Sequence, residues 1–164
     1  MPRKVFLGKI TVFDLPSIYT WQKNVEDAIL RNAKTVPKNF FSVVIWYVKI
    51  LRREQGKIQY FAIRNSFLAP IGYATIKNEF DDGQETADIG IFLGKYRNLG
   101  FGSVTLDFIE KFCSRRDILR LRAIVNAENT ISVNFFIKNG FKIVSEDSIN
   151  KIYIKEIKAT NNLD

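Results

Sequence analysis

The spacing of hydrophobic and polar positions changes several times along the chain, and each change marks an expected element. Val5 to Phe13 alternates loosely, which predicts an opening strand. Asp14 is the expected N-cap of a helix that runs to about Asn32. After a break at Pro37, residues 40–53 are predicted to form a second helix. Its apolar stripe consists of Phe41, Val44, Ile45, Val48 and Leu51.

Three strands are expected next, over residues 58–64, 70–79 and 85–93. The last two are joined by Asp81-Asp82-Gly83, which has the chemistry of a hairpin turn. The third strand is mostly apolar, so we expect it to be central and buried.

The rest of the chain alternates helices and strands. A stripe from Phe101 to Phe112 predicts a helix, residues 119–125 a strand, and residues 129–138 a short helix that ends at Asn139-Gly140. Residues 141–144 and 149–157 are predicted closing strands. The order β-α-α-β-β-β-α-β-α-β-β predicts an α/β (α+β) fold with a mixed sheet of about seven strands and helices on both faces. With no repeat or linker, one domain spans residues 1–164.

Composition excludes several kinds of chemistry. The chain has 164 residues, 46% hydrophobic and 13% aromatic, which excludes a disordered or fibrous protein. It has no histidine, which removes serine–histidine catalysis and histidine metal sites. Its single cysteine, Cys113, excludes an intramolecular disulfide and a cysteine metal cluster, so we expect no metal cofactor. Cys113 lies on an apolar helical stripe and is interpreted as a small buried hydrophobe.

Charge and apolar runs bear on partners and compartment. The 25 lysines and arginines exceed the 17 acidic residues, giving a formal charge of +8 that favours acidic partners in general. No apolar run is long enough for a membrane span or a signal peptide. We therefore expect a cytoplasmic protein without a membrane partner.

The segment from Leu93 to Ser103 carries the most informative motif. Gly100 and Gly102 stand one residue apart at an expected helix start, where backbone N–H groups can bind a phosphate. Lys95 and Arg97 add positive charge beside them. The segment lacks the third glycine of a dinucleotide-binding fingerprint and the Gly-Lys-Ser/Thr of a Walker A loop. Taken alone, the two glycines are more typical of a tight turn than of a phosphate-binding loop.

With its context, this segment resembles the GNAT N-acetyltransferase superfamily. Arg97-Asn98-Leu99-Gly100-Phe101-Gly102 is similar to the family's Arg/Gln-x-x-Gly-x-Gly/Ala loop for the acetyl-CoA pyrophosphate. Residues 129–141 are similar to its Asn-x-x-Ser/Ala…Gly-Phe segment, and the element order agrees. Residues 14–22 and 46–51 resemble a branch that contains ribosomal-protein N-terminal and amino-sugar acetyltransferases.

The resemblance implies how acetyl-CoA is bound. Backbone groups of Phe92 and Leu93 would pair with the pantetheine arm, Asn129 would hydrogen-bond to the pantetheine, and Phe136 would lie along the cofactor near the thioester. The core role of the phenylalanines and a helix-capping role of Asn129 are compatible with these contacts. The implied pyrophosphate loop comprises Arg97, Asn98, Leu99, Gly100, Phe101, Gly102 and Ser103.

The resemblance also implies direct acetyl transfer to a primary amine, which must lose a proton before attack. Asp88 corresponds to a catalytic carboxylate in one branch; either it faces the active-site cleft or it pairs with an arginine. Glu79 and Glu85 flank the hairpin turn and are second candidates, unless they are merely solvated. The family's usual proton-donating tyrosine is replaced by Phe136. Tyr153 and Ser132 are candidate acids, and an exposed closing strand is the alternative for Tyr153.

Three functions remain distinguishable at this point. The first is an acetyl-CoA-dependent N-acetyltransferase, for which the positive charge favours an acidic acceptor such as a nucleotide-linked amino sugar over a polyamine; a protein N-terminus stays open. The second is a non-catalytic acyl-CoA-binding module, favoured by Phe136. The third, nucleic-acid binding, would use the arginines at positions 115, 116, 120 and 122, for which a solvated basic face is the simpler interpretation. A homodimer is compatible with the family.

Overall fold

The computed structural model describes residues 4–24, 36–53, 58–81 and 83–159, and the predicted fold class is confirmed there. In these residues, seven strands form one mixed sheet in the order β1-β2-β3-β4-β5-β7-β6. Strands β4 and β5 pair in parallel, and the other neighbours are antiparallel. The strands are β1 Phe6–Lys9, β2 Ile58–Arg64, β3 Pro70–Asp81, β4 Gln84–Leu93, β5 Arg120–Asn126, β6 Lys142–Glu146 and β7 Asn150–Glu156.

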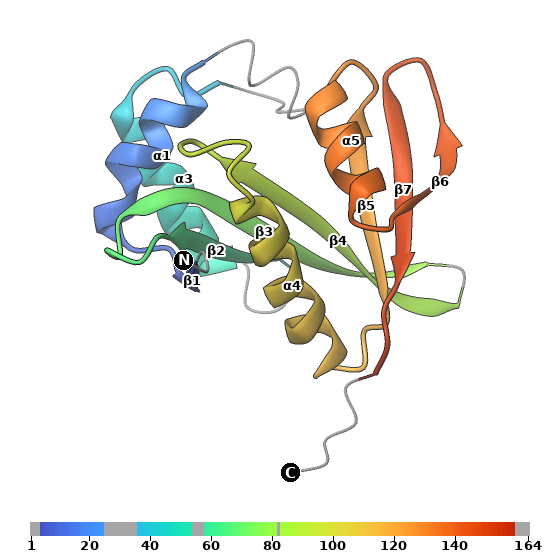
Figure 1. Ribbon diagram of the computed structural model, residues 1–164. Helices are drawn as coiled ribbons and strands as arrows, with labels where there is room; N and C mark the ends of the chain where they lie inside the picture. Colours follow the sequence, from blue (N-terminus) through green and yellow to red (C-terminus); the bar gives the residue numbers. More distant parts are fainter. Residues whose placement is uncertain (1–3, 25–35, 54–57, 82, 160–164) are drawn as a thin grey trace.

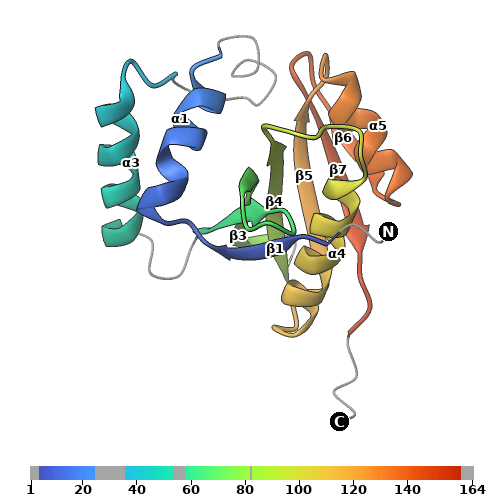
Figure 2. The ribbon, with the colours of Figure 1, turned by 60° about the vertical axis from the view of Figure 1, so that its left-hand side comes forward.

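Helices cover both faces of the sheet, as the alternating second half predicts (Figures 1 and 2). On one face, α1 (Leu15–Gln22) and α3 (Phe40–Arg53) bury Ile18 and Val43 against β2. On the other face lie α4 (Phe101–Ser114) and α5 (Thr130–Lys138), and the larger core lies beneath them. Its fully buried residues include Ile63, Ile71, Ile76, Leu106, Ile109, Cys113 and Leu121. The predicted burial of Cys113 is thus confirmed.

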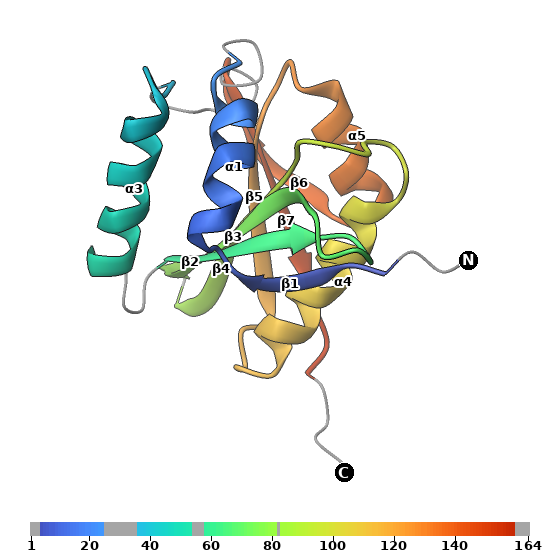
Figure 3. The same ribbon diagram turned by 90° about the vertical axis from the view of Figure 1, so that its left-hand side faces the viewer.

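The N-terminal elements are shorter than predicted. The expected strand from Val5 to Phe13 pairs only over β1 and continues into a 3₁₀ turn, Val12–Asp14. Asp14 precedes α1 as expected, yet its side chain does not cap that helix. It accepts hydrogen bonds from the Thr11 N–H (2.7 Å) and from Nη2 of Arg64 (2.6 Å), which tie the turn to β2. Figure 3 shows how β1 leads into α1 along this edge.

Two helix predictions are corrected. Helix α1 ends at Gln22 and not near Asn32, at a point where the sequence has no glycine or proline to mark the stop; residues 25–32 of the prediction lie outside the described part. In α3, the predicted stripe is only partly right: Phe41 is 67% and Ile45 42% accessible, whereas Val44 packs against the core as predicted. The side chain of Leu51 lies outside the described part. The packed side presents Val43, Val44, Trp46 and Tyr47. Because α3 is apolar around most of its circumference, spacing alone does not select the packed side.

The feature that positions the site is the divergence of β4 and β5. Their parallel pairing covers only Thr86–Asp88 against Arg120–Arg122. Beyond it, β4 continues to Leu93 and β5 to Asn126 without pairing with each other. Figure 1 shows the two strands separating above this point. The result is a wedge in the middle of the sheet whose two edges carry backbone hydrogen-bonding groups.

Candidate functional site

The loop from β4 to α4 has an alternating backbone. Tyr96, Asn98 and Gly100 have φ values of 57°, 60° and 81°, so every second residue is left-handed. Such alternation turns successive N–H groups toward one side and forms an anion-binding concavity. The loop is fixed at its start, because the N–H groups of Gly94 and Lys95 both donate to the Ile71 carbonyl, at 2.9 and 3.1 Å.

Helix α4 begins at the end of this loop without a side-chain cap. Gly100 is the N-cap, the first turn holds no acidic residue, and the Val104 N–H makes the first intrahelical bond, to Gly100. The N–H groups of the first turn therefore remain available to an anion, and the helix dipole favours negative charge there. A Cβ on Gly102 would lie 2.9 Å from the Phe135 ring, so this glycine lets α4 approach α5 closely.

The predicted binding residues at the wedge edges are placed as follows. Arg97 donates from Nε to the Leu93 carbonyl (2.8 Å), and its guanidinium lies 5.5 Å from the centre of the Phe92 ring. Asn129 caps α5 by accepting from the Ser132 N–H (3.1 Å), which confirms the predicted cap. Phe136 is 6% exposed in the larger core, which confirms its core role.

At the base of the wedge, Asp88 is held by Arg122. The guanidinium donates from Nε to Oδ1 (2.5 Å) and from Nη2 to Oδ2 (3.1 Å), and its Nη1 reaches Asp81 at 2.5 Å. The hydrogen bond with Asp88 raises the pKa of Arg122 above its usual value. Of the two predicted environments for Asp88, pairing with an arginine is thus found, and Asp88 also lines a pocket.

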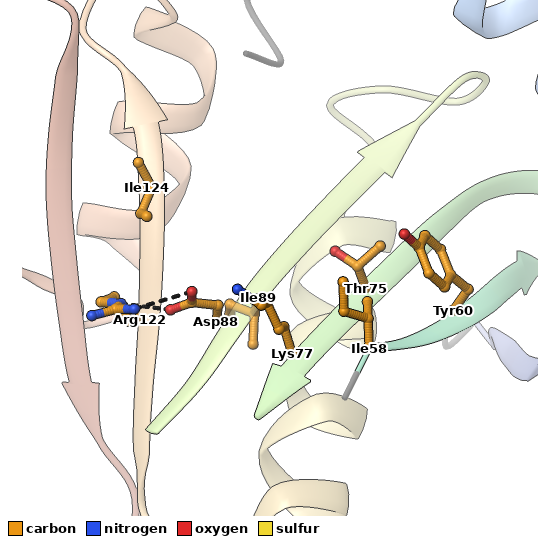
Figure 4. Close-up of a pocket in the computed structure, with 8 residues that line it drawn as sticks. All are labelled: Ile58, Tyr60, Thr75, Lys77, Asp88, Ile89, Arg122 and Ile124. Atoms are coloured by element: carbon orange, nitrogen blue, oxygen red, sulfur yellow. Dashed lines mark hydrogen bonds and ion pairs between the residues drawn. The ribbon is translucent and has the colours of Figure 1, made fainter. Parts of the chain in front are cut away.

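That pocket has a volume of about 220 Å³ and opens on the α1/α3 face of the sheet. Figure 4 shows Asp88 and Arg122 directed toward each other across the β4–β5 gap, with Ile89 beside Asp88 on β4 and the other lining residues on β2, β3 and farther along β5. The lining consists of Ile58, Tyr60, Thr75, Lys77, Asp88, Ile89, Arg122 and Ile124.

The remaining catalytic candidates are less close to the pocket. Glu79 forms an ion pair with Lys77 and is not a lining residue. Glu85 is exposed, as its solvated alternative predicts. The exposed alternative for Tyr153 is wrong: this residue is 1% exposed and stacks on Phe136 with ring centres 6.4 Å apart. Tyr153 is buried because its side of β7 faces α4 and α5, where Lys155 pairs with Glu110 of α4 (2.6 Å).

Sequence reasoning missed three residues of this region. In the sequence, Arg122 belongs only to a basic cluster, because its partners Asp81 and Asp88 lie on β3 and β4. Lys77 pairs with Glu79 of its own strand, but no local pattern shows that Lys77 lines a pocket. Trp21 covers Gly94, where a Cβ would overlap its ring. Asn98 and Gly100 were the available signal for the loop, since asparagine and glycine tolerate left-handed backbone; Tyr96, the third left-handed residue, gives no such signal.

The described residues contain no cluster of three or more acidic or cysteine side chains arranged to hold a metal ion. Within the same residues, no helix has both the length and the apolar character that crossing a bilayer requires.

Comparison with known proteins finds one matching family model and a number of solved structures with a similar fold. Residues 19–141 match the model of the Acetyltransferase (GNAT) family. No curated protein sequence matches the chain.

Among solved structures, a spermidine N-acetyltransferase from Vibrio cholerae in complex with CoA and spermine is 15% identical, with a TM-score of 0.79, over 93% of this chain and 95% of that one. FdhC, a nucleotide-linked sugar GNAT, is 20% identical, with a TM-score of 0.77, over 93% and 86%. RimL, a ribosomal L7/L12 α-N-protein acetyltransferase in complex with CoA, is 18% identical, with a TM-score of 0.76, over 95% and 96%. At these identities, the likeness shows the fold alone.

Proposed function

Because the chain belongs to the GNAT family of acetyltransferases, we propose that it transfers the acetyl group of acetyl-CoA directly to a primary amine. The observation that carries the proposal is the end of β4–β5 pairing at Asp88 and Arg122. It leaves a wedge with a loop at one end that suits a phosphate group and a pocket containing a carboxylate at its base.

The residues around the wedge fit acetyl-CoA. The backbone of Phe92 and Leu93 would bind the pantetheine arm along the open edge of β4. The N–H groups from Asn98 to Ser103 would bind the pyrophosphate, and the alternating loop and the uncapped helix start support this assignment. Asn129 stands at the start of α5 and would bind the arm from the β5 side. Acetyl-CoA supplies the activated acetyl group.

Asp88 is the base in this proposal. An alkyl ammonium with a pKa near 10.4 must lose a proton before it can attack the thioester. Both carboxylate oxygens of Asp88 accept from Arg122, and each can accept one further hydrogen bond, from the amine or from a water that relays its proton. Arg122 fixes the orientation of the carboxylate. Glu79 would influence the reaction only through Lys77, because Lys77 is its ion-pair partner and lines the pocket.

Tyr153 is the acid that we propose for the leaving thiolate. Phe136 stands where the family's tyrosine is usual and has no proton to give. The Tyr153 ring stacks on Phe136, so Tyr153 is a phenol in direct contact with the residue that replaces the family's tyrosine. The burial of Tyr153 supports a fixed position for that hydroxyl.

Phe136 also favours one alternative, a non-catalytic module that binds acyl-CoA. The two functions are separated by measuring acetyl-CoA binding and thiol release on the same sample. Binding is followed by the rise in melting temperature, and release by a thiol reagent in the presence of a nucleotide-linked amino sugar or a peptide with a free N-terminus. Amine-dependent thiol release with an acetylated product supports the enzyme. A melting-temperature rise without release from any amine supports the binding module.

A further inference from the structure

The cluster of ion-paired residues at the pocket has a net charge opposite in sign to that of the whole chain. The whole chain carries +8, which by itself favours an acidic acceptor. The two cations of the pocket lining are already held by carboxylates: Lys77 by Glu79, and Arg122 by both Asp88 and Asp81. Three carboxylates against two cations give this cluster a net charge of −1.

The described neighbours of the cluster do not reverse that sign. Arg120 precedes Arg122 by two residues on β5, so it lies on the same side of the sheet, and it is 3.1 Å from Glu156 of β7. This additional pair is neutral. The surplus of positive charge therefore belongs to other surfaces, and the positive charge of the chain is a poor guide to its acceptor.

The positive charge of both cations is already balanced by carboxylates. Arg122 uses Nε, Nη1 and Nη2 on its two carboxylate partners. The hydrogen bond to Glu79 raises the pKa of Lys77, which keeps this lysine charged within its pair. A phosphate or carboxylate entering the pocket would have to displace one of these partners or lie beside it, and like charges in contact are unfavourable.

The rest of the lining suits a small, weakly polar body. Ile58, Ile89 and Ile124 are aliphatic, and Tyr60 and Thr75 add hydroxyl groups. A volume of about 220 Å³ is below the usual 300–1,000 Å³ of pockets for drug-sized ligands. The pocket therefore holds a small acceptor or the amine-bearing end of a longer one.

On the premise of the acetyl transfer proposed above, we propose that this pocket selects a primary amine with no phosphate or carboxylate near it, and that Asp81 is a specificity-determining residue. Asp81 supplies the surplus negative charge, and it holds Nη1 of Arg122 away from an incoming anion. A nucleotide-linked amino sugar would be excluded wherever its phosphates reach the pocket.

The test uses three amines that share a four-carbon chain and differ in the charge of the far end: 1,4-diaminobutane, 4-aminobutan-1-ol and 4-aminobutanoate. We expect kcat/KM for thiol release to be at least tenfold higher for the diamine than for aminobutanoate at low ionic strength. Asp81→Asn should reduce this ratio at least threefold, mainly by improving aminobutanoate. Glu85→Gln removes the same charge from an exposed site on the same hairpin and should leave the ratio unchanged.

Several results would overturn the inference. If kcat/KM is as high for aminobutanoate as for the diamine, the inference fails while the proposed acetyl transfer stands. The inference also fails if Asp81→Asn leaves the ratio of the two kcat/KM values unchanged. If no amine releases thiol, the transfer proposal fails, and the selectivity is then measured by binding. With saturating CoA, the diamine should raise the melting temperature more than aminobutanoate does. An equal or larger rise with aminobutanoate refutes the proposed selectivity of the pocket.

Discussion

The contact between Trp21 and Gly94 links the packing of α1 to the proposed cofactor loop. Trp21 is 7% exposed, and its ring also packs on Phe92 with centres 6.2 Å apart. A Cβ built on Gly94 would lie within 3.0 Å of the ring atoms Cδ2, Cε2 and Nε1. Gly94→Ala would thus require the ring or the loop to move by roughly 1 Å, and such overpacking typically costs about 1–3 kcal/mol of unfolding free energy.

A double-mutant cycle measures this contact. We expect Gly94→Ala to destabilise by about 2 kcal/mol and Trp21→Leu by about 2–3 kcal/mol, measured by urea denaturation. The double variant should lose about 1–2 kcal/mol less than the two single losses combined, because the added methyl group no longer meets an indole. Trp46→Leu is the control: it alters a tryptophan of the same cluster that contacts Tyr60, so its loss should add to that of Gly94→Ala.

The same variants report on the loop. Because Gly94 and Lys95 fix the start of the loop to β3, Gly94→Ala should weaken acetyl-CoA binding about tenfold, and Trp21→Leu should restore part of it. Additive stabilities in the cycle, or wild-type affinity for acetyl-CoA in Gly94→Ala, would refute the claim that Trp21 and Gly94 position this loop.

Three further predictions concern the loop, the proposed catalytic groups and the buried thiol. Gly100→Ala and Gly83→Ala impose a similar strain, because both glycines have positive φ (81° and 76°), yet only Gly100→Ala should reduce the acetyl-CoA-induced rise in melting temperature. Asp88→Asn should lower kcat about 100-fold, and Tyr153→Phe should lower kcat without changing the KM for acetyl-CoA. A wild-type kcat in either variant would refute the role proposed for that residue. Burial raises the pKa of Cys113 from 9.0 to about 11, so its stabilising contribution is present below pH 9 and is lost as the pH rises toward 11. Over that range, wild-type stability should fall relative to Cys113→Ala by about 2–3 kcal/mol, and parallel stability curves would contradict this.

Elements with a clear periodicity were predictable from the sequence, and their ends were less so. Helix α4 and strands β2 and β4 lie where their patterns predict. The end of α1 at Gln22 has no local signal. The packed side of α3 was predicted only in part, with Val44 right and Phe41 wrong, because the choice between Phe41 and Val43 depends on which neighbour covers the helix.

The candidate site also contains some residues that were predictable from the sequence and others that were not. The loop from Asn98 to Ser103 was predictable because its glycines and asparagine reflect local backbone requirements. The partner of Asp88 was not, since Arg122 is 34 residues away in sequence and meets Asp88 only through the β4–β5 register. Tyr153 shows the same limit: Ile152 and Ile154 alternate with it, and the sequence does not reveal which side of β7 the helices cover.

The central claim, that the β4–β5 wedge holds acetyl-CoA, is tested most directly by a crystal structure of the protein with CoA. We predict pantetheine between β4 and β5, hydrogen-bonded to the backbone of Phe92 or Leu93. We also predict pyrophosphate oxygens within hydrogen-bond distance of N–H groups between Asn98 and Ser103. CoA bound elsewhere, with β4 and β5 hydrogen-bonded to each other beyond Asp88 and Arg122, would contradict the account.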